Sequence, residues 1–285
     1  MTGNTPDLDS RLGRYEMMYT IRLFEQKIEE LFEQGLIHGT AHLCIGQEAA
    51  AVGAVSASRA GDPIVSSHRG HGHFLARSAD PAALMGEMLG KATGPCRGRG
   101  GSQHLCARDL AFYGTNGITG GGIPTATGLG LSEKVDGSDK AVLCFFGDGA
   151  TNQGTFHESL NMASIWDLPV VYICENNLYA MSTSVENSMG VNAVAERASA
   201  YRMPGRRWTG WILMRFEKPS RRPWIVPEGV TVPPLSRPDV TASAGIRRAT
   251  GWSIARAKKR SAGRRWIRSE SSGFTCEKAG WRRRA

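Results

Sequence analysis

One acidic residue, Asp148, lies between two glycines at the end of an apolar run, in the segment FFGDGATNQG at 145–154. A second apolar run ends in ENNLYA, which places the amides of Asn176 and Asn177 shortly after it. A carboxylate, an amide oxygen and backbone carbonyls form an all-oxygen ligand set, which suits Mg²⁺ or Ca²⁺ rather than zinc or copper. Mg²⁺ binds through one or two carboxylates and completes its shell with water and phosphates. A single Asp therefore implies that a diphosphate supplies the remaining ligands.

Other residues strengthen this interpretation. Gly147 and Gly149 would let the backbone approach a phosphate closely. Arg69 could neutralise the remaining charge through a bidentate contact. The G-D-G sequence alone is more typical of an ordinary turn. Its combination with a second apolar run that ends in N-N favours a ligand site.

Two strands and a helix must position these groups. KAVLCFFGDG (140–149) predicts a buried strand, TFHESLNMASIWD (155–167) a helix, and LPVVYICENN (168–177) a second buried strand. This β-α-β unit indicates an α/β fold with a parallel sheet flanked by helices. Ligands of such sheets bind at the carboxyl ends of the strands, so we expect Asp148 and Asn177 to face one ligand.

Elsewhere the spacing of apolar residues predicts an amphipathic helix over 14–35 and further helices over 48–60 and 81–94. The segment 62–78 reads as a short strand followed by a loop rich in histidine and glycine. The segment 94–131 contains too much glycine for regular structure and predicts a long loop. Long loops in compact domains are usually functional or disordered.

The composition fits a globular protein with one large domain or two small ones, at 285 residues and 41% hydrophobic content. No uninterrupted apolar stretch reaches about 18 residues, which argues against a membrane span. The polar N-terminus lacks the pattern of a secretory signal, so we expect a cytoplasmic protein. The six cysteines include no C-x-x-C pair and read as reduced, which implies neither a zinc site nor a disulfide framework.

The net charge of +9 is the sum over two parts of the chain that have opposite net charges. From Arg206 onward the sequence has 16 Arg and 4 Lys against 5 acidic residues, a charge of +15, which leaves about −6 for residues 1–205. The tail at 206–285 also holds six of the seven tryptophans. We therefore expect a boundary near residue 205.

Several motifs of the first part occur together and in order. They are RLFEQKI, HLCIGQEA, HRGHG, GRGGSQH, NGITGGGIP, GDGATNQGTFHESLNMAS and ENNLYAMST. In this order they resemble the α subunit of heterotetrameric 2-oxo acid dehydrogenase E1 components, a group that includes the pyruvate, branched-chain and acetoin enzymes. The resemblance covers about residues 12–205. It implies a thiamine-diphosphate-binding fold of the diphosphate-binding type.

The resemblance assigns roles to individual residues. The implied Mg²⁺ ligands are Asp148, Asn177 and the main-chain oxygen of Tyr179. The implied contacts with the cofactor are made by His68, Arg69, Gly117, Thr119, Gly149 and Ala150, although His68 stands where many relatives have Tyr. His42 and His71 would face the reacting centre, where imidazoles can stabilise oxyanions or move protons. His104 is a weaker candidate for such a role.

The resemblance also implies an activity and partners. Thiamine diphosphate and Mg²⁺ would serve the oxidative decarboxylation of pyruvate or a related 2-oxo acid, with acyl transfer to lipoamide on an E2 component. A glutamate from an E1 β subunit would complete the site in an α2β2 heterotetramer, so we expect the chain alone to be inactive. The acetoin dehydrogenase α subunit is an alternative, since NGITGGGIP leans toward the acetoin and pyruvate branches. HLCIGQEA and GGSQH argue against other enzymes with this cofactor, such as a transketolase half.

The resemblance stops after YRMPG, where related sequences continue into V-D-G-x-D and later Y-R-x-x-G-H-S. Back-translation of Arg207 to Ile212 as CGG TGG ACG GGA TGG ATC gives A-V-D-G-M-D when read from the third base of the preceding Arg codon. The same offset through DVTASAGI permits C-Y-R-F-S-G-H. Our hypothesis is that residues 206–285 are translated out of frame and are not natively folded. The alternative is a basic arm that binds nucleic acid, which interleaved cations and aromatics can do. The number of tryptophans in the tail argues against such a solvated arm and therefore against nucleic acid as a partner.

Overall fold

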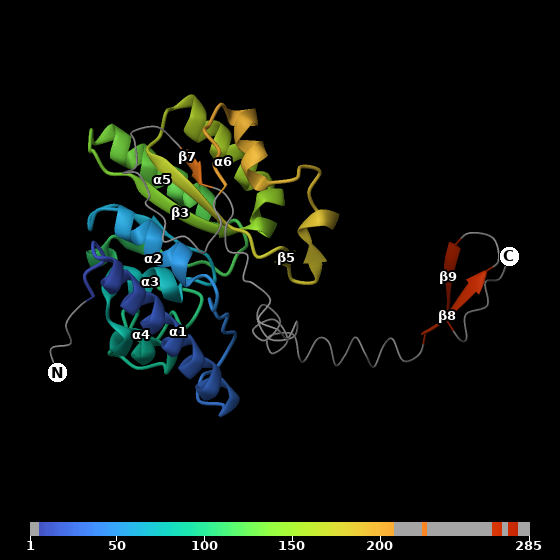
Figure 1. Cartoon of the computed structure of the whole chain (residues 1–285), viewed down its shortest axis with the longest axis horizontal. Coiled ribbons are helices and arrows are strands. Elements are labelled where there is room, and N and C mark those ends of the chain that lie inside the picture. Colours follow the sequence, from blue (N-terminus) through green and yellow to red (C-terminus); the bar gives the residue numbers. More distant parts are fainter. Residues whose placement is uncertain (1–5, 208–223, 227–263, 270–272, 279–285) are drawn as a thin grey trace.

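A computed structural model describes residues 6–207, 224–226, 264–269 and 273–278 (Figure 1). Its main feature is a parallel sheet with the strand order β2-β1-β3-β4-β7. The strands are β1 Ile64–Val65, β2 Phe112–Gly114, β3 Val142–Gly147, β4 Val170–Glu175 and β7 Trp224–Val226. The predicted α/β class with a parallel sheet is thus confirmed.

Helices cover both faces of the sheet (Figure 1). One face carries α1 Arg11–Glu33, α2 Glu48–Ala57, α3 His71–Ser78 and α4 Pro81–Met88, and the other carries α5 Gly122–Val135 and α6 Gly154–Ile165. Successive residues of a strand point to opposite faces. In β4, Val171 and Ile173 accordingly belong to the core with α1 to α4, and Val170 and Tyr172 to the core with α5 and α6.

The longest predicted helix is confirmed as α1, with Met17, Ile21, Phe24 and Ile28 on its buried face. The side chain of Ser10 accepts a hydrogen bond at 2.9 Å from the backbone N–H of Gly13 and so caps the helix start. The spacing of the apolar residues therefore predicted the buried face of the helix correctly. The cap explains why the helix begins three residues earlier than predicted.

The expectation that 94–131 contains no regular structure is wrong, because β2 and most of α5 lie within it. Two of the glycines of α5, Gly122 and Gly130, allow close packing against the sheet. A Cβ on Gly130 would lie 2.4 Å from Val170 Cγ2, and one on Gly122 would lie 3.0 Å from Val65 Cγ1. The loop predicted after the first strand likewise contains α3.

Glu87 at the end of α4 organises the remaining glycine-rich segment. Its fully buried carboxylate accepts four backbone hydrogen bonds, from Cys96 (2.8 Å), Gly98 (3.0 Å), Gly100 (2.7 Å) and Gly101 (3.2 Å). Buried backbone N–H groups need partners, and bonds to an ionised acceptor are the strong ones. The Glu87 carboxylate thus supplies the hydrogen-bond acceptors that a neighbouring strand would otherwise provide, and so orders this segment.

The other described elements are short. They are β5 Tyr179–Ala180 paired with β6 Thr183–Ser184, β8 Arg264–Ser269 paired with β9 Gly273–Lys278, and the 3-10 helices Arg108–Leu110, Asp148–Asn152, Val185–Asn187 and Val194–Tyr201. Most of the tail at 206–285 lies outside the described residues, so its out-of-frame origin stays a prediction. Within the described part of the chain, every helix is too short or too polar to cross a membrane.

Candidate functional site

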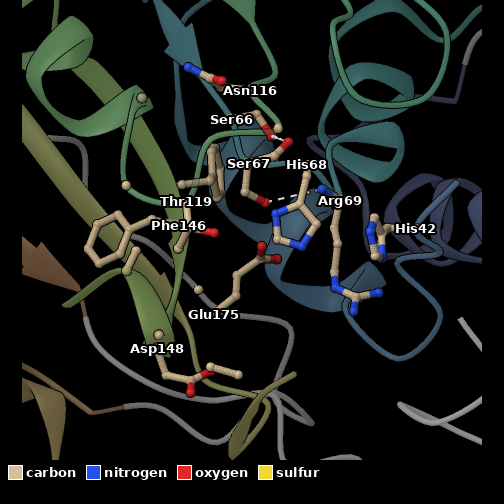
Figure 2. A pocket seen from close by; sticks show the side chains of 18 of the residues that line it. His42, Ser66, Ser67, His68, Arg69, Asn116, Thr119, Phe146, Asp148 and Glu175 are labelled. Atoms are coloured by element: carbon tan, nitrogen blue, oxygen red, sulfur yellow. Dashed lines mark hydrogen bonds between the residues drawn. The ribbon is translucent and has the colours of Figure 1, made fainter. Parts of the chain in front are cut away.

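The strand order creates a crevice at one point of the sheet. After β1 the chain passes to β2 at the edge and then returns to β3 on the other side of β1. Ligands of open α/β sheets bind where the strand order reverses in this way, outside the carboxyl ends of the strands. A cavity of about 250 Å³ lies there, lined by residues that follow β1, β2, β3 and β4 (Figure 2).

The cavity brings together the predicted site residues except His71 and the additional candidate His104. Its lining includes His42, His68, Arg69, Gly117, Thr119, Asp148, Gly149, Ala150, Asn177 and Tyr179. His71 is fully buried outside this lining, and His104 is exposed outside it. Five separate segments of the chain therefore converge on the cavity, and they include the two loops after β3 and β4 that were expected to face one ligand.

Asp148 and Asn177 leave the ends of neighbouring strands, because Gly147 of β3 pairs with Glu175 of β4. Asp148 is 4% exposed, and Asn177 Oδ1 accepts a hydrogen bond at 3.2 Å from the Tyr179 N–H. A Cβ on Gly149 would lie 2.5 Å from Ala180 Cβ, so only glycine fits at that position.

The described residues contain no cluster of three or more His, Cys, Asp or Glu side chains that could hold a metal by themselves. A cation at Asp148 and Asn177 would therefore take further oxygen ligands from backbone carbonyls, water or a bound ligand. This donor set is the one that Mg²⁺ uses in phosphate-binding sites. The residues present fit Mg²⁺ together with a diphosphate.

Arg69 provides the cationic side of the cavity. Its Nη1 donates to the Leu43 carbonyl at 2.6 Å, and the described part of the chain places no acidic side chain within 4.0 Å of its guanidinium. Burial lowers the pKa of Arg69, whereas Cys44, Glu175 and other acidic groups nearby oppose that shift. A buried guanidinium without an ion pair favours an anionic ligand.

His42 and His68 lie side by side, with ring centroids 4.8 Å apart and planes at 77°. Burial lowers the pKa of each to about 4, and the positive charge of Arg69 is the next cause. His42 Nδ1 is buried and has no hydrogen-bond partner among the described residues. Both rings are therefore neutral near pH 7, and His42 keeps a polar atom available to a ligand.

These shifts predict a pH dependence of stability. A histidine has a pKa near 6.5 in the unfolded chain and about 4 in the folded one, so between these values the unfolded state binds more protons. We expect the unfolding free energy to fall as the pH is lowered from about 6.5 to about 4. A His68→Gln variant should lose less stability over this range than the wild type, as measured by urea denaturation. An equal loss in both proteins would contradict this, and His38→Gln, at an exposed position, is the control.

His71 acts in a buried network. Its Nδ1 lies 2.7 Å from Glu25 Oε1 and its Nε2 lies 2.9 Å from Ser102 Oγ. Ser102 Oγ accepts the N–H of His42 at 3.4 Å, and Glu25 Oε2 accepts the N–H of Cys44 at 3.0 Å. The network thus holds the segment that carries His42 into the cavity. The structure does not bring His71 itself to the cavity, so its catalytic role stays a prediction.

The cavity also contains polar residues that the sequence did not single out. They are Gln47, Ser66, Ser67, Gln103, Asn116 and Glu175. Glu175 is the charged member of this set and stands next to the predicted N-N pair. Its position as an acid at the end of a buried strand was the available signal.

Comparison with known proteins agrees with this geometry. Residues 16–210 match the family model described as "Dehydrogenase E1 component". The α subunits of acetoin:2,6-dichlorophenolindophenol oxidoreductase from Bacillus subtilis and Cupriavidus necator are 48% and 45% identical over 69% and 70% of this chain. The pyruvate dehydrogenase E1 α subunit of Rhizobium meliloti is 42% identical over 68% of it. The chain spans only 56–60% of the length of these relatives. It belongs to the dehydrogenase E1 component family.

Proposed function

We propose that this chain is the α subunit of an E1 component that uses thiamine diphosphate to cleave a bond beside the carbonyl of a 2-oxo acid or of acetoin. The observation that carries the proposal is the convergence of Asp148, Asn177 and Arg69 on one cavity at the reversal of strand order. Thiamine diphosphate, when bound, supplies the electron-accepting ring for this bond cleavage.

The residues of this chain would bind and orient that cofactor. Asp148, Asn177 and the Tyr179 carbonyl would hold Mg²⁺, while Arg69 would bind the diphosphate. Gly149 lets the backbone approach the phosphates without a clash with Ala180. Gly117 and Thr119 line the part of the cavity after β2, where the aminopyrimidine would lie.

His42 and His68 would then serve as neutral polar groups beside the reacting atoms. Their lowered pKa keeps them uncharged at neutral pH, so they can donate a hydrogen bond to a developing oxyanion or accept a proton. A β subunit would supply the other half of the site, and lipoamide on an E2 component would accept the acyl group.

Acetoin is a specific second candidate for the substrate, because the two acetoin relatives are more similar to this chain than the Rhizobium meliloti pyruvate relative is. Both reactions would use the same Mg²⁺ and diphosphate site.

The proposal is tested by calorimetric titration of the full chain, mixed with an E1 β subunit, with thiamine diphosphate. We expect binding that requires Mg²⁺ and is competed by inorganic pyrophosphate but not by free thiamine. ADP serves as the control diphosphate. Equal affinity for ADP and thiamine diphosphate, or binding without a divalent cation, would count against the proposal.

A further inference from the structure

Glu175 is an acidic residue in a cavity whose other features suit an anion. It ends β4, is 3% exposed, and belongs to the cavity lining. Figure 2 shows its carboxylate between Asp148, at one end of the cavity, and His68 at the other. Neither the proposed Mg²⁺ site nor the proposed diphosphate contacts require this second carboxylate.

The protein supplies only partial compensation for this group. His73 Nε2 lies 3.3 Å from Glu175 Oε1, but neither atom has a hydrogen-bond partner among the described residues. His73 is held elsewhere, since its Nδ1 lies 2.9 Å from Ser66 Oγ and its ring stacks on Phe145 at 3.8 Å. The other cation of this wall, Arg69, has no acid within 4.0 Å in the described structure, so its charge interaction with Glu175 is a longer-range one.

The surroundings of Glu175 make an uncompensated charge costly. Phe145, Phe146 and Ile123 line the same cavity and lower its local polarity. A buried carboxylate is unfavourable unless it is paired or hydrogen-bonded, and a countercharge acts more strongly in such surroundings than in water. The cavity therefore favours a ligand with both signs of charge, an anion for Arg69 and a cation or donor for Glu175.

We propose that Glu175 contacts the positively charged ring of the ligand and selects a zwitterion over a simple diphosphate. The inference rests on the proposed function, in which thiamine diphosphate joins an anionic diphosphate to a cationic thiazolium ring. It assigns Glu175 to the ring, whereas Asp148 and Arg69 serve the phosphates. Loss of the carboxylate should therefore affect ligands according to the charge of their ring.

The test compares wild type with Glu175→Gln, which keeps the shape of the side chain and removes its charge. Calorimetry with Mg²⁺ present would measure three ligands, namely thiamine diphosphate, inorganic pyrophosphate and thiamine thiazolone diphosphate, whose ring is neutral. We expect Glu175→Gln to weaken thiamine diphosphate binding by roughly tenfold or more. Binding of the thiazolone analogue and of pyrophosphate should change by less than about twofold.

Two further variants keep the test informative. Glu175→Asp retains the charge, so its loss of affinity should be smaller and again confined to thiamine diphosphate. Glu133→Gln removes another buried carboxylate, one that accepts from Ser138 Oγ at 2.5 Å outside the cavity, and should leave all three affinities unchanged. Thermal unfolding would confirm that each variant is folded.

The outcomes separate this inference from the proposed function. Equal weakening of all three ligands, or no weakening of any, would overturn the role of Glu175 and leave the thiamine diphosphate site intact. If the Glu175→Gln variant does not fold, the test depends on Glu175→Asp. A loss of affinity in that variant for pyrophosphate as well as for thiamine diphosphate would overturn the role of Glu175. A wild-type chain that binds neither thiamine diphosphate nor pyrophosphate would overturn both.

Discussion

Replacement of Asp148 by Asn is expected to weaken the Mg²⁺-dependent binding of thiamine diphosphate by at least about 100-fold. Asp148 is the carboxylate at the proposed metal position and is almost fully buried there. Asn keeps the shape and one oxygen but removes the negative charge that attracts a hard cation. The measurement is calorimetric titration of the variant with thiamine diphosphate over a range of Mg²⁺ concentrations.

The variant should need a higher Mg²⁺ concentration to bind thiamine diphosphate, because the amide of Asn177 and the Arg69 guanidinium remain in place. Asp136→Asn, at an exposed position at the end of α5, removes the same charge elsewhere and should bind like the wild type. An Asp148→Asn variant with unchanged Mg²⁺ dependence would show that the cation is held by other residues or is not needed.

The positions of Asp148 and Asn177 could be predicted from the sequence because both residues directly follow the carboxyl ends of buried strands. The apolar runs before Asp148 and Asn177 identified two buried strands, and the short helix between them required these strands to be parallel. Parallel neighbours bring their carboxyl ends to one edge, which places the two side chains in one cavity. Long-range packing did not need to be known for this step.

Features that depend on tertiary contacts could not be predicted in this way. Glycines lower the helix propensity of α5, and only the contacts of Gly122 with Val65 and of Gly130 with Val170 show that two of them allow close packing on the sheet. His71 shares a short motif with Arg69, yet its partners Glu25 and Ser102 come from distant segments. The sequence around His71 therefore could not predict that these partners bury its side chain.

The composition of the tail gains a chemical explanation if it is read out of frame. The second base of each codon in the shifted frame is the first base of a codon in the frame that encodes the present sequence. Codons for Trp begin with U, and every codon with U in second position encodes Phe, Leu, Ile, Met or Val. Arg codons of the CGN type place C second, which encodes Ser, Pro, Thr or Ala. A tail with 16 Arg and six Trp would thus become rich in small and apolar residues.

Insertion of one nucleotide after codon 205 of the gene is therefore expected to restore a family-like C-terminus and enzymatic activity. The shifted frame should then read V-D-G and, later, Y-R-x-x-G-H, in the order seen in related α subunits. Together with an E1 β subunit, the restored chain should turn over acetoin or pyruvate at least about 100-fold faster than the present one, because the segment with the Y-R-x-x-G-H motif would be restored beside the proposed cofactor site. The measurement is dye reduction with each substrate, with and without thiamine diphosphate. The present chain, assayed beside it, is the control. A gene whose shifted frame contains stop codons or lacks both motifs would refute the explanation, as would full activity of the present chain.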